Sequence, residues 1–355
     1  MKFSALPGRK KGNFPKKKKG MNNNGLPKIA VLAGGYSGEA AISIKSAYTI
    51  VQNIDRSKYT PYTVRIDRDL WWVELDKTTR ADIDRDSFTW KDSEGVQHKF
   101  DAVFIMVHGT PGEDGILQKY FETLEIPFST GSSDSVRLTF NKFKANNKLR
   151  AEGIFVADSI EIKREEVLSE SRMSEIAQIV KIPCFVKPNK GGSSLGVTRV
   201  ENTIDLREAI EFAFETECPS VLIESLLEGR EFSVGLVPDE NGIPIVLPVT
   251  EIITENAFFD YKAKYEGESL EITPAKISLE DTAIIQETVM KATEILRCKW
   301  MVRVDIILVH GETPAVLEIN SVPGFTDESI LPQQLSCAGI KLPDVISRIL
   351  KGILE

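Results

Sequence analysis

The sequence of 355 residues contains few cysteines and no long apolar run. Its four cysteines, Cys184, Cys218, Cys298 and Cys337, lie far apart and form no C-x-x-C pair. This spacing argues against a zinc site or a disulfide framework and favours a reducing compartment. No apolar run reaches the roughly 18 residues that cross a membrane, and the first residues lack the apolar segment of a secretory signal. We therefore expect a cytoplasmic protein that does not enter the membrane.

Acidic side chains are absent from the first 20 residues, which hold eight of the 44 lysines and arginines. The rest of the chain carries 36 basic and 52 acidic side chains, so its body is acidic. An acidic body is a poor binder of nucleic acid, and we expect no nucleic-acid partner. The lysine run at residues 16–19 is typical of a solvated tail, so residues 1–26 are predicted to be a basic, disordered leader.

Two common nucleotide-binding patterns are also absent. The first glycine turn, with Gly34, Gly35 and Gly38, does not match G-x-G-x-x-G, so a nicotinamide site is poorly supported. The glycine- and serine-rich loop at residues 190–196 lacks the order of a Walker loop. Its glycines still allow backbone N–H groups to approach phosphate oxygens, and Lys187 before it would neutralise phosphate charge. An ordinary surface loop is the alternative interpretation.

Apolar runs that alternate with helical patterns predict an α/β protein, and the length suggests two or three domains. A strand, a glycine turn and a helix at residues 28–50 are typical of the start of an open α/β sheet. Residues 254–274 show no clean period, which is typical of a functional lid or of disorder. Further strands are predicted at 61–66, 102–107, 183–186, 221–224, 231–236, 302–309 and 315–320, and further helices at 116–124, 135–153, 206–214 and 278–297.

The last two predicted strands form an antiparallel hairpin with one polar face. Arg303 and Asp305 lie two residues apart on the first strand, and Glu318 and Asn320 lie two apart on the second. Residues two apart on a strand point to the same side of the sheet. Oxygen ligands of this kind suit Mg²⁺, which takes one or two carboxylates together with phosphate oxygens. The alternative is the exposed face of an ordinary antiparallel sheet.

Two further carboxylates are placed to serve a nucleotide. Glu224 ends the apolar run Val-Leu-Ile-Glu, and Glu231 follows seven residues later. A carboxylate near a nucleotide commonly accepts hydrogen bonds from the ribose hydroxyls. Each of these residues is also compatible with an ordinary surface position.

In combination, these motifs resemble a D-alanine–D-alanine ligase, a member of the ATP-grasp superfamily. The resemblance extends from about residue 28 to residue 349. It implies an ATP-grasp fold with an N-terminal Rossmann-like open-sheet domain at 27–141, a central ATP-binding lid domain at 142–229 and a C-terminal catalytic domain at 230–355. The motifs that carry it are residues 34–39, 108–115, Lys142, 186–196, the Ile-Glu pair ending at 224, 229–232, 260–265, 303–305 and 318–326.

The resemblance implies a reaction in which ATP phosphorylates the carboxylate of one D-alanine and the amine of a second D-alanine attacks the acyl phosphate. The dipeptide product would feed peptidoglycan synthesis. Because two anions must meet, neutralisation of charge dominates such catalysis. Two Mg²⁺ (or Mn²⁺) ions per active site are implied, held by Asp305, Glu318 and Asn320. The residues implied to bind ATP are Lys142, Lys187, Gly192, Ser193, Ser194, Glu224, Leu226, Leu227, Glu231 and Lys264.

The resemblance also implies roles at the first D-alanine. Glu39 is expected to pair with its ammonium group, and His108 is expected to lie nearby. Ser193 and Tyr265 are expected to link Glu39 to the phosphate loop and to the lid. A tyrosine at position 265 is similar to the amide-forming relatives rather than to those that make the D-alanyl-D-lactate ester.

At the second D-alanine, the resemblance implies that Ser329 and the Ile330 amide hold the carboxylate. Arg303 and the N–H of Gly324 are expected to form the oxyanion hole for the tetrahedral carbon. Arg303 suits this role because a guanidinium stays charged at any working pH. The implied catalytic set is therefore Glu39, Ser193, Tyr265, Arg303, Gly324 and Ser329.

Three alternatives remain at this stage. The nearest is another ATP-grasp ligase, which makes D-alanyl-D-lactate or a D-alanyl-D-serine dipeptide. A nicotinamide oxidoreductase on a doubly wound sheet is disfavoured by the missing G-x-G-x-x-G. A nucleotide-binding module without catalysis is disfavoured by Arg303, because a binder needs no oxyanion hole. The family also implies a homodimer.

Overall fold

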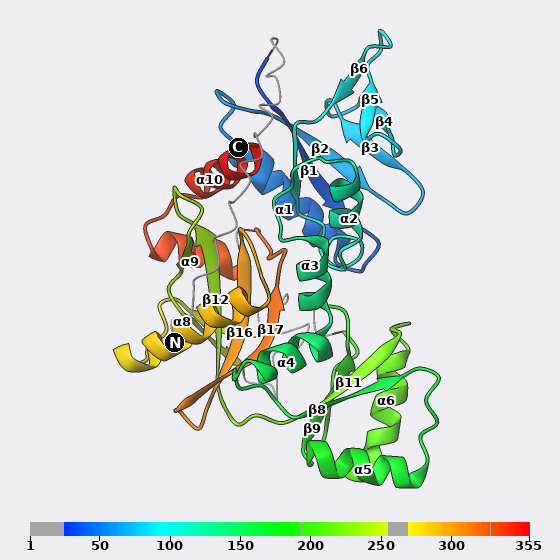
Figure 1. The fold of residues 1–355 in the computed structure, drawn as a ribbon, viewed down its shortest axis with the longest axis vertical. Helices are drawn as coiled ribbons and strands as arrows, with labels where there is room; N and C mark the ends of the chain where they lie inside the picture. Colours follow the sequence, from blue (N-terminus) through cyan, green and yellow to red (C-terminus); the bar gives the residue numbers. More distant parts are fainter. Residues whose placement is uncertain (1–24, 193–194, 255–268, 327) are drawn as a thin grey trace, which may run out of the picture.

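The computed structural model describes residues 25–192, 195–254, 269–326 and 328–355. Three β-sheets organise this part of the chain, and helices cover them (Figure 1). None of the helices within these ranges is both long and apolar enough to cross a membrane. The combination of β-sheets and covering helices confirms the predicted α/β class.

The first sheet has the strand order β6-β5-β4-β3-β2-β1-β7. Its centre is parallel, with β1 between β2 and β7, and β3 to β6 extend it as antiparallel strands. The predicted strands at β1, β2 and β7 are confirmed. The strand bounds are β1 (Lys28–Gly34), β2 (Thr60–Ile66), β3 (Trp71–Glu74), β4 (Arg80–Asp84), β5 (Thr89–Lys91), β6 (Gln97–Lys99) and β7 (Ala102–Ile105).

Strand β1 is apolar at successive residues because both of its faces are buried. Ile29 and Val31 belong to a core shared with α1 (Ala40–Asn53) and α10 (Leu342–Leu354). Ala30 and Leu32 belong to a second core on the other face, with α2 (Ile116–Thr123) and the antiparallel strands. The last helix of the chain thus packs on the first sheet, against α1 and β7 (Figure 1).

The antiparallel extension of this sheet was not predicted. Its four strands are only three to five residues long, so they show little periodicity. Aspartate side chains close two of its turns: Asp76 Oδ1 accepts from the backbone N–H of Thr78 at 2.8 Å, and Asp92 Oδ1 accepts from Val96 N at 2.9 Å. Such Asx turns favour tight reversals of the chain.

The long helix predicted at residues 135–153 is wrong, because two helices occupy this stretch. Helix α3 (Ser133–Phe140) ends before Asn141, and α4 (Lys142–Ala151) begins after it. Asn141 has extended dihedral angles, and its side chain accepts a hydrogen bond from Lys144 N at 2.9 Å. This N-cap starts a new helix and fixes the direction of Lys142.

The second sheet is antiparallel, with the order β10-β9-β11-β8. Helices α5 and α6 cover one face, where Val186 and Ile223 belong to a buried core. The alternate residues Phe185, Lys187 and Glu224 therefore face the other side, toward the third sheet. The bounds are β8 (Ser159–Lys163), β9 (Cys184–Pro188), β10 (Thr198–Val200), β11 (Ser220–Ser225), α5 (Glu170–Val180), the 3₁₀ helix (Thr203–Asp205) and α6 (Leu206–Phe214).

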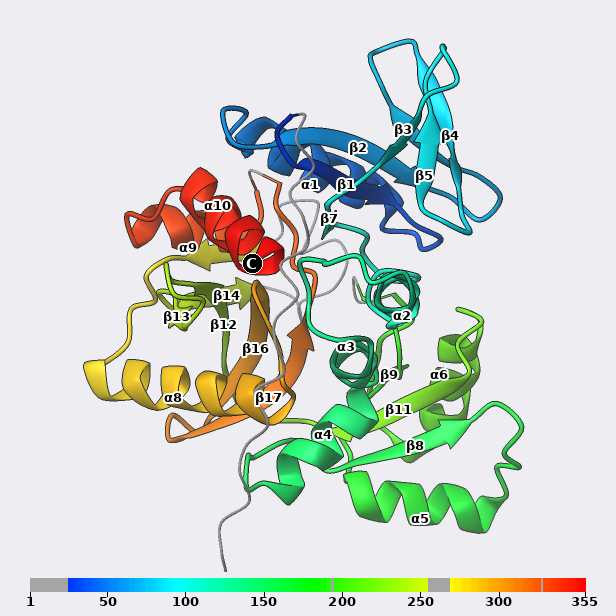
Figure 2. The ribbon, with the colours of Figure 1, turned by 45° about the horizontal axis from the view of Figure 1, so that its top comes forward.

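The third sheet has the order β15-β14-β12-β16-β17, and β13 pairs with β12. Helices α4 and α8 cover one face through a core that includes Phe232, Val304 and Val316. Figure 2 shows α8 and α4 on one side of this sheet and α9 near its opposite end. The bounds are β12 (Gly229–Pro238), β13 (Pro244–Val246), β14 (Thr250–Thr254), β15 (Ser269–Ile272), α8 (Leu279–Ile295), β16 (Val302–Val309), β17 (Thr313–Asn320) and α9 (Ile330–Cys337).

The predicted irregular segment at 254–274 lies partly outside the described residues. Residues 255–268 are not described, whereas residues 269–272 form strand β15 rather than irregular chain. This strand pairs with β14, with Glu271 opposite Ile252. An edge strand of four residues is too short to be distinguished by its alternation.

Candidate active site

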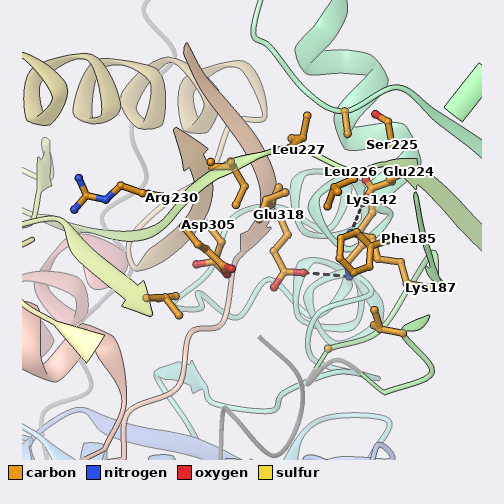
Figure 3. Close-up of a pocket in the computed structure, with 18 of the residues that line it drawn as sticks. Lys142, Phe185, Lys187, Glu224, Ser225, Leu226, Leu227, Arg230, Asp305 and Glu318 are labelled. Atoms are coloured by element: carbon orange, nitrogen blue, oxygen red, sulfur yellow. Dashed lines mark ion pairs between the residues drawn. The ribbon is translucent and has the colours of Figure 1, made fainter. Parts of the chain in front are cut away.

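A cavity of about 430 Å³, here called cavity 1, lies between the second and third sheets. Lys187 and Phe185 line it from the second sheet, and Asp305 and Glu318 line it from the third (Figure 3). Leu226 also lines it, from the connection between the sheets. Apolar and charged side chains thus share one chamber.

The lysine on the second sheet is held by a buried carboxylate. Lys187 Nζ forms an ion pair with Glu224 Oε2, and Asn146 Nδ2 donates to Glu224 Oε1 at 3.0 Å. Burial acts to lower the pKa of Lys187, but the charge and hydrogen bond of Glu224, together with the charges of Glu318 and Glu231, raise that pKa overall. Lys187 is therefore a fixed cation on the cavity wall. Asn146 lies one helical turn after Lys142, so α4 supplies both Lys142 and the amide that holds Glu224.

Lys142 connects the loop that follows β9 to the β16–β17 hairpin. Its Nζ donates to the carbonyl oxygen of Gly191 at 2.6 Å and lies 3.4 Å from Glu318 Oε2. The Lys142 backbone N–H donates to Asn189 O at 3.1 Å. Asn189 is fully buried, and its side-chain oxygen accepts from Phe143 N at 2.9 Å. The start of α4 is thereby fixed to the loop that follows β9.

The polar face of the β16–β17 hairpin is confirmed by the strand register. Arg303 lies opposite Asn320, and Asp305 lies opposite Glu318. Arg303 donates two hydrogen bonds to Asp305, from Nε to Oδ1 at 3.0 Å and from Nη2 to Oδ2 at 2.8 Å. Ser233 Oγ on β12 donates to the same carboxylate at 2.6 Å. These bonds hold a nearly fully buried carboxylate in one orientation.

The donor set of this hairpin is compatible with Mg²⁺. No group of three or more Asp, Glu, His or Cys side chains in the described ranges is placed to hold a metal by itself. Mg²⁺ commonly takes one or two protein carboxylates and completes its shell with phosphate oxygens and water. Asp305, Glu318 and Asn320 supply two carboxylates and one amide oxygen.

A second cavity, of about 390 Å³ and here called cavity 2, lies on the other side of Lys142. Glu39 lines it from the N-terminus of α1, His108 from the segment after β7, and Arg303 from β16 of the third sheet. Cavities 1 and 2 have four lining residues in common, which are Lys142, Gly191, Gly192 and Glu318. The two cavities are therefore neighbours across a shared wall.

Glu39 stands at the N-terminus of α1, where a glycine loop approaches it. A Cβ on Gly192 would lie 2.9 Å from Glu39 Oε1, so the loop lies directly against the Glu39 carboxylate. Glu113 lines the same cavity as Glu39, and its Oε2 accepts a hydrogen bond from Gly109 N at 2.7 Å. Burial, together with the Glu39 charge, raises the pKa of Glu113 to about 8. Glu39 is thus beside a carboxyl group that holds its proton.

His108 joins three segments of the chain. Its Nδ1 donates to Val322 O at 2.9 Å, and its Nε2 lies 3.4 Å from Ser46 Oγ on α1. Ser46 Oγ in turn accepts from Phe325 N at 3.0 Å. Burial lowers the pKa of His108, and the Glu39 charge opposes this shift. The imidazole is therefore neutral at neutral pH, as its role as an acceptor at Nε2 requires.

The far end of cavity 2 is the start of α9. Ser329 occupies the N-cap position, but its Oγ accepts from Thr326 N at 3.0 Å instead of capping the helix. Ile330 follows as the first helical residue and lines the cavity. A Cβ on Gly324 would lie 3.0 Å from Ser329 Oγ, so the loop and the helix start are in close contact. The N–H groups of a helix start form a site that favours a carboxylate.

Each predicted site residue within the described ranges lines one of the two cavities. Ser193, Ser194, Lys264 and Tyr265 lie outside the described residues. Sequence reasoning missed several residues that line the cavities or support their walls, because their positions depend on contacts between segments far apart in the chain. They are Ser46, Glu113, Asn146, Phe185, Asn189, Ser233 and Glu271.

Two sheets that close on a cavity with lysines on one side and carboxylates on the other define the ATP-grasp fold. The family model "D-ala D-ala ligase N-terminus" matches residues 28–132, and "D-ala D-ala ligase C-terminus" matches residues 149–351. The chain belongs to the D-alanine–D-alanine ligase family, as its motifs predicted.

Curated relatives and solved structures agree with this assignment. The chain is 41% identical to the D-alanine–D-alanine ligase of Phocaeicola vulgatus over 325 residues, which cover 91% of this chain and 98% of the relative. It is 41% identical to that of Flavobacterium johnsoniae, with 92% and 99% covered. The crystal structure of the VanG D-Ala:D-Ser ligase from Enterococcus faecalis is similar with a TM-score of 0.81 and 29% identity, covering 93% of this chain and 100% of that one.

Proposed function

We propose that this protein is an ATP-dependent ligase that joins two molecules of D-alanine into D-alanyl-D-alanine, a precursor for peptidoglycan. The observation that carries the proposal is the wall shared by cavities 1 and 2. The last phosphate of a nucleotide in cavity 1 and a carboxylate in cavity 2 would meet there. Lys142, Gly191, Gly192 and Glu318 supply the cation, the backbone N–H groups and the metal-binding oxygen that two meeting anions require.

Cavity 1 is the proposed ATP site. Lys142 and Lys187 would contact the phosphates, and Gly192 would offer its backbone N–H. Leu226 and Leu227 would cover the adenine, with Phe185 on the opposite wall. The proposed acceptors for the polar groups of the nucleoside are Glu224 and Glu231.

Proteins of this family use ATP with a divalent metal, and we propose Mg²⁺ or Mn²⁺, two ions per site. Asp305, Glu318 and Asn320 would hold them, because their oxygens share one face of the hairpin. When bound, the ions would neutralise charge on the phosphates. Glu318 also lies beside Lys142, so the hairpin and α4 would act on the same phosphate.

Cavity 2 is the proposed site for the two amino acids. Glu39 would pair with the ammonium of the first D-alanine, close to the neutral His108. Ser329 and the Ile330 amide would hold the carboxylate of the second, at the start of α9. The reacting carbon would then lie between them.

The reaction proceeds in two proposed steps. A carboxylate oxygen of the first D-alanine attacks the γ-phosphorus of ATP, and ADP leaves. The ammonium group of the second D-alanine loses one proton to become an amine, and its nitrogen then attacks the acyl carbon, loses a second proton and expels inorganic phosphate. Between these events the acyl oxygen carries negative charge, which Arg303 and the Gly324 N–H would stabilise.

Several further proposals accompany this function. We propose domain boundaries at 27–141, 142–229 and 230–355, a homodimer and a cytoplasmic location. The four cysteines are free, which accords with a reducing compartment. Sedimentation of the purified protein would test the dimer.

The function is tested by measuring phosphate release from ATP and Mg²⁺. The added amino acids are D-alanine, L-alanine, or D-alanine with either D-lactate or D-serine. We expect release that needs D-alanine, yields the dipeptide and vanishes in Glu318→Ala. Release only with D-lactate or D-serine present would reassign the second substrate. Absence of D-alanine-dependent release would overturn the proposal.

A further inference from the structure

Cavity 2 is lined by more carboxyl groups than the proposed roles account for. Among the residues that the structure describes, five carboxylates line it: Glu39, Glu113, Glu271, Glu318 and Glu328. Two D-alanine molecules bring two ammonium groups into this cavity, and Glu39 serves only one of them. One of the remaining carboxylates is therefore available for the second ammonium.

Three of these carboxylates are poorly placed for that task. Glu113 lies at the Glu39 end, where Gly109 N donates to it and its raised pKa keeps it protonated. Glu318 is paired with Lys142 and belongs to the proposed metal set. Glu328 is exposed at the rim of the cavity. Glu271 is the carboxylate that remains.

Glu271 is held at the end of cavity 2 where the second D-alanine is proposed to bind. Gln333 Nε2 donates to Glu271 Oε2 at 2.7 Å, and the same nitrogen lies 3.4 Å from Glu328 O. Gln333 is on α9, one helical turn after Ser329. In the described ranges no other hydrogen bond to the Glu271 side chain is formed, so Gln333 orients it from one side.

The electrostatic surroundings of Glu271 suit a ligand cation. Burial raises the pKa of the Glu271 carboxyl, while the Gln333 hydrogen bond and the Arg303 charge lower it, and Asp305 adds to the rise. A partly buried carboxylate gains more from a cationic ligand than an exposed one, because water screens the pair less. Arg303 lines the same cavity as Glu271, so the proposed oxyanion hole opens onto the space that the attacking nitrogen must enter.

We propose that Glu271, oriented by Gln333, holds the amino group of the second D-alanine and makes the site prefer an amine over a hydroxy acid. Glu271 would be a binding and specificity-determining residue, and Gln333 a positioning residue. This inference rests on the proposed ligase function. D-Lactate carries a hydroxyl where D-alanine carries an ammonium, so it would gain nothing from the Glu271 charge.

The test separates the two D-alanine sites by steady-state kinetics of the full chain, with dipeptide and ester quantified at fixed pH. In Glu271→Gln we expect the KM of the second D-alanine to rise about tenfold or more, because a charge-assisted hydrogen bond is lost. The KM of ATP stays unchanged, and the ratio of ester to dipeptide rises when D-lactate competes. Gln333→Ala keeps the charge, so it raises the same KM by less and leaves the ester ratio unchanged.

Glu328→Gln is the matched control, because it removes the same charge at the exposed rim. We expect it to behave as the wild type. An equal effect of Glu328→Gln and Glu271→Gln would overturn the inference, as would a folded Glu271→Gln with wild-type KM and product ratio. A wild type that makes no dipeptide would instead overturn the proposed function, so the two failures are distinguishable.

Discussion

The ammonium nitrogen of Lys142 lies 3.4 Å from Oε2 of Glu318, and both residues line both cavities. Lys142 is the first residue of α4, and Glu318 lies near the end of β17. The contact joins two segments that are 176 positions apart in the sequence. It places a cation and a carboxylate on the wall where the proposed phosphoryl transfer takes place.

The first prediction concerns the charge of Lys142. Lys142→Gln keeps the length of the side chain but removes the cation, so the transferred phosphate loses a fixed counter-charge. We expect kcat/KM for ATP to fall about 100-fold, comparable to the loss of one oxyanion donor. Coupled measurement of ADP release checks this. Lys144→Gln, an exposed change on the same helix, is the control, and an equally small effect of both changes would contradict the prediction.

The second prediction concerns the buried pair of Lys187 and Glu224. Glu224→Gln leaves the Lys187 charge without its partner, and breaking a buried pair costs roughly 3 kcal/mol of unfolding free energy. The KM of ATP is expected to rise as well. Urea unfolding measures the first effect. The exposed pair of Lys148 and Glu152, 2.7 Å apart, provides the control Glu152→Gln, which is expected to cost less than about 1 kcal/mol.

The third prediction concerns pH. Glu113 has a pKa of about 8 in the folded protein, above its ordinary value of 4.5. Between these values the folded state binds one more proton than the unfolded state, so the unfolding free energy falls as pH rises. The stabilisation is complete below pH 4.5 and is lost as pH rises through about 8.

Glu113→Gln keeps an acceptor for Gly109 N and removes this titration. Urea unfolding of both proteins at pH 5.5, 7 and 8.5 measures the difference. We expect the wild type to lose more stability than the variant over this range. Parallel pH dependences would refute the assignment of the raised pKa to Glu113.

The fourth prediction concerns the support of α9. Gln334 is fully buried; its Nε2 donates to Ser233 O at 2.8 Å and to Thr250 Oγ1 at 2.9 Å, and its Oε1 accepts from Gly235 N at 2.9 Å. Gln334→Ala leaves these partners unsatisfied and is expected to cost about 2–3 kcal/mol. The KM of the second D-alanine should rise too, because α9 carries Ser329.

Thermal and urea unfolding check the stability of this variant. The control is Gln52→Ala on the exposed side of α1, for which we expect a change within about 0.5 kcal/mol. If Gln334→Ala were as stable as this control, the bonds of Gln334 would not be what holds α9 to the sheet.

Much of the candidate site could be predicted from the sequence because its side chains follow local rules. Arg303 and Asp305, like Glu318 and Asn320, are two residues apart, and a strand puts such residues on one face whatever surrounds it. The register of β16 and β17 confirmed the shared face. Glycine turns were equally visible, because glycine adopts the positive φ angles of Gly34 and Gly35 more readily than any other residue.

What only the tertiary structure decided are the contacts between distant segments. Nothing local places Gln333 beside Glu271, Ser46 beside His108, or the last helix α10 on the first sheet. Nor does the helical pattern at 135–153 reveal that Asn141 interrupts it. Periodicity and turn chemistry depend on residues only a few positions apart, so they can be recognised in the sequence alone. Partners far apart in sequence are chosen by the burial of apolar faces and the satisfaction of polar groups, which exist only once the sheets have packed together.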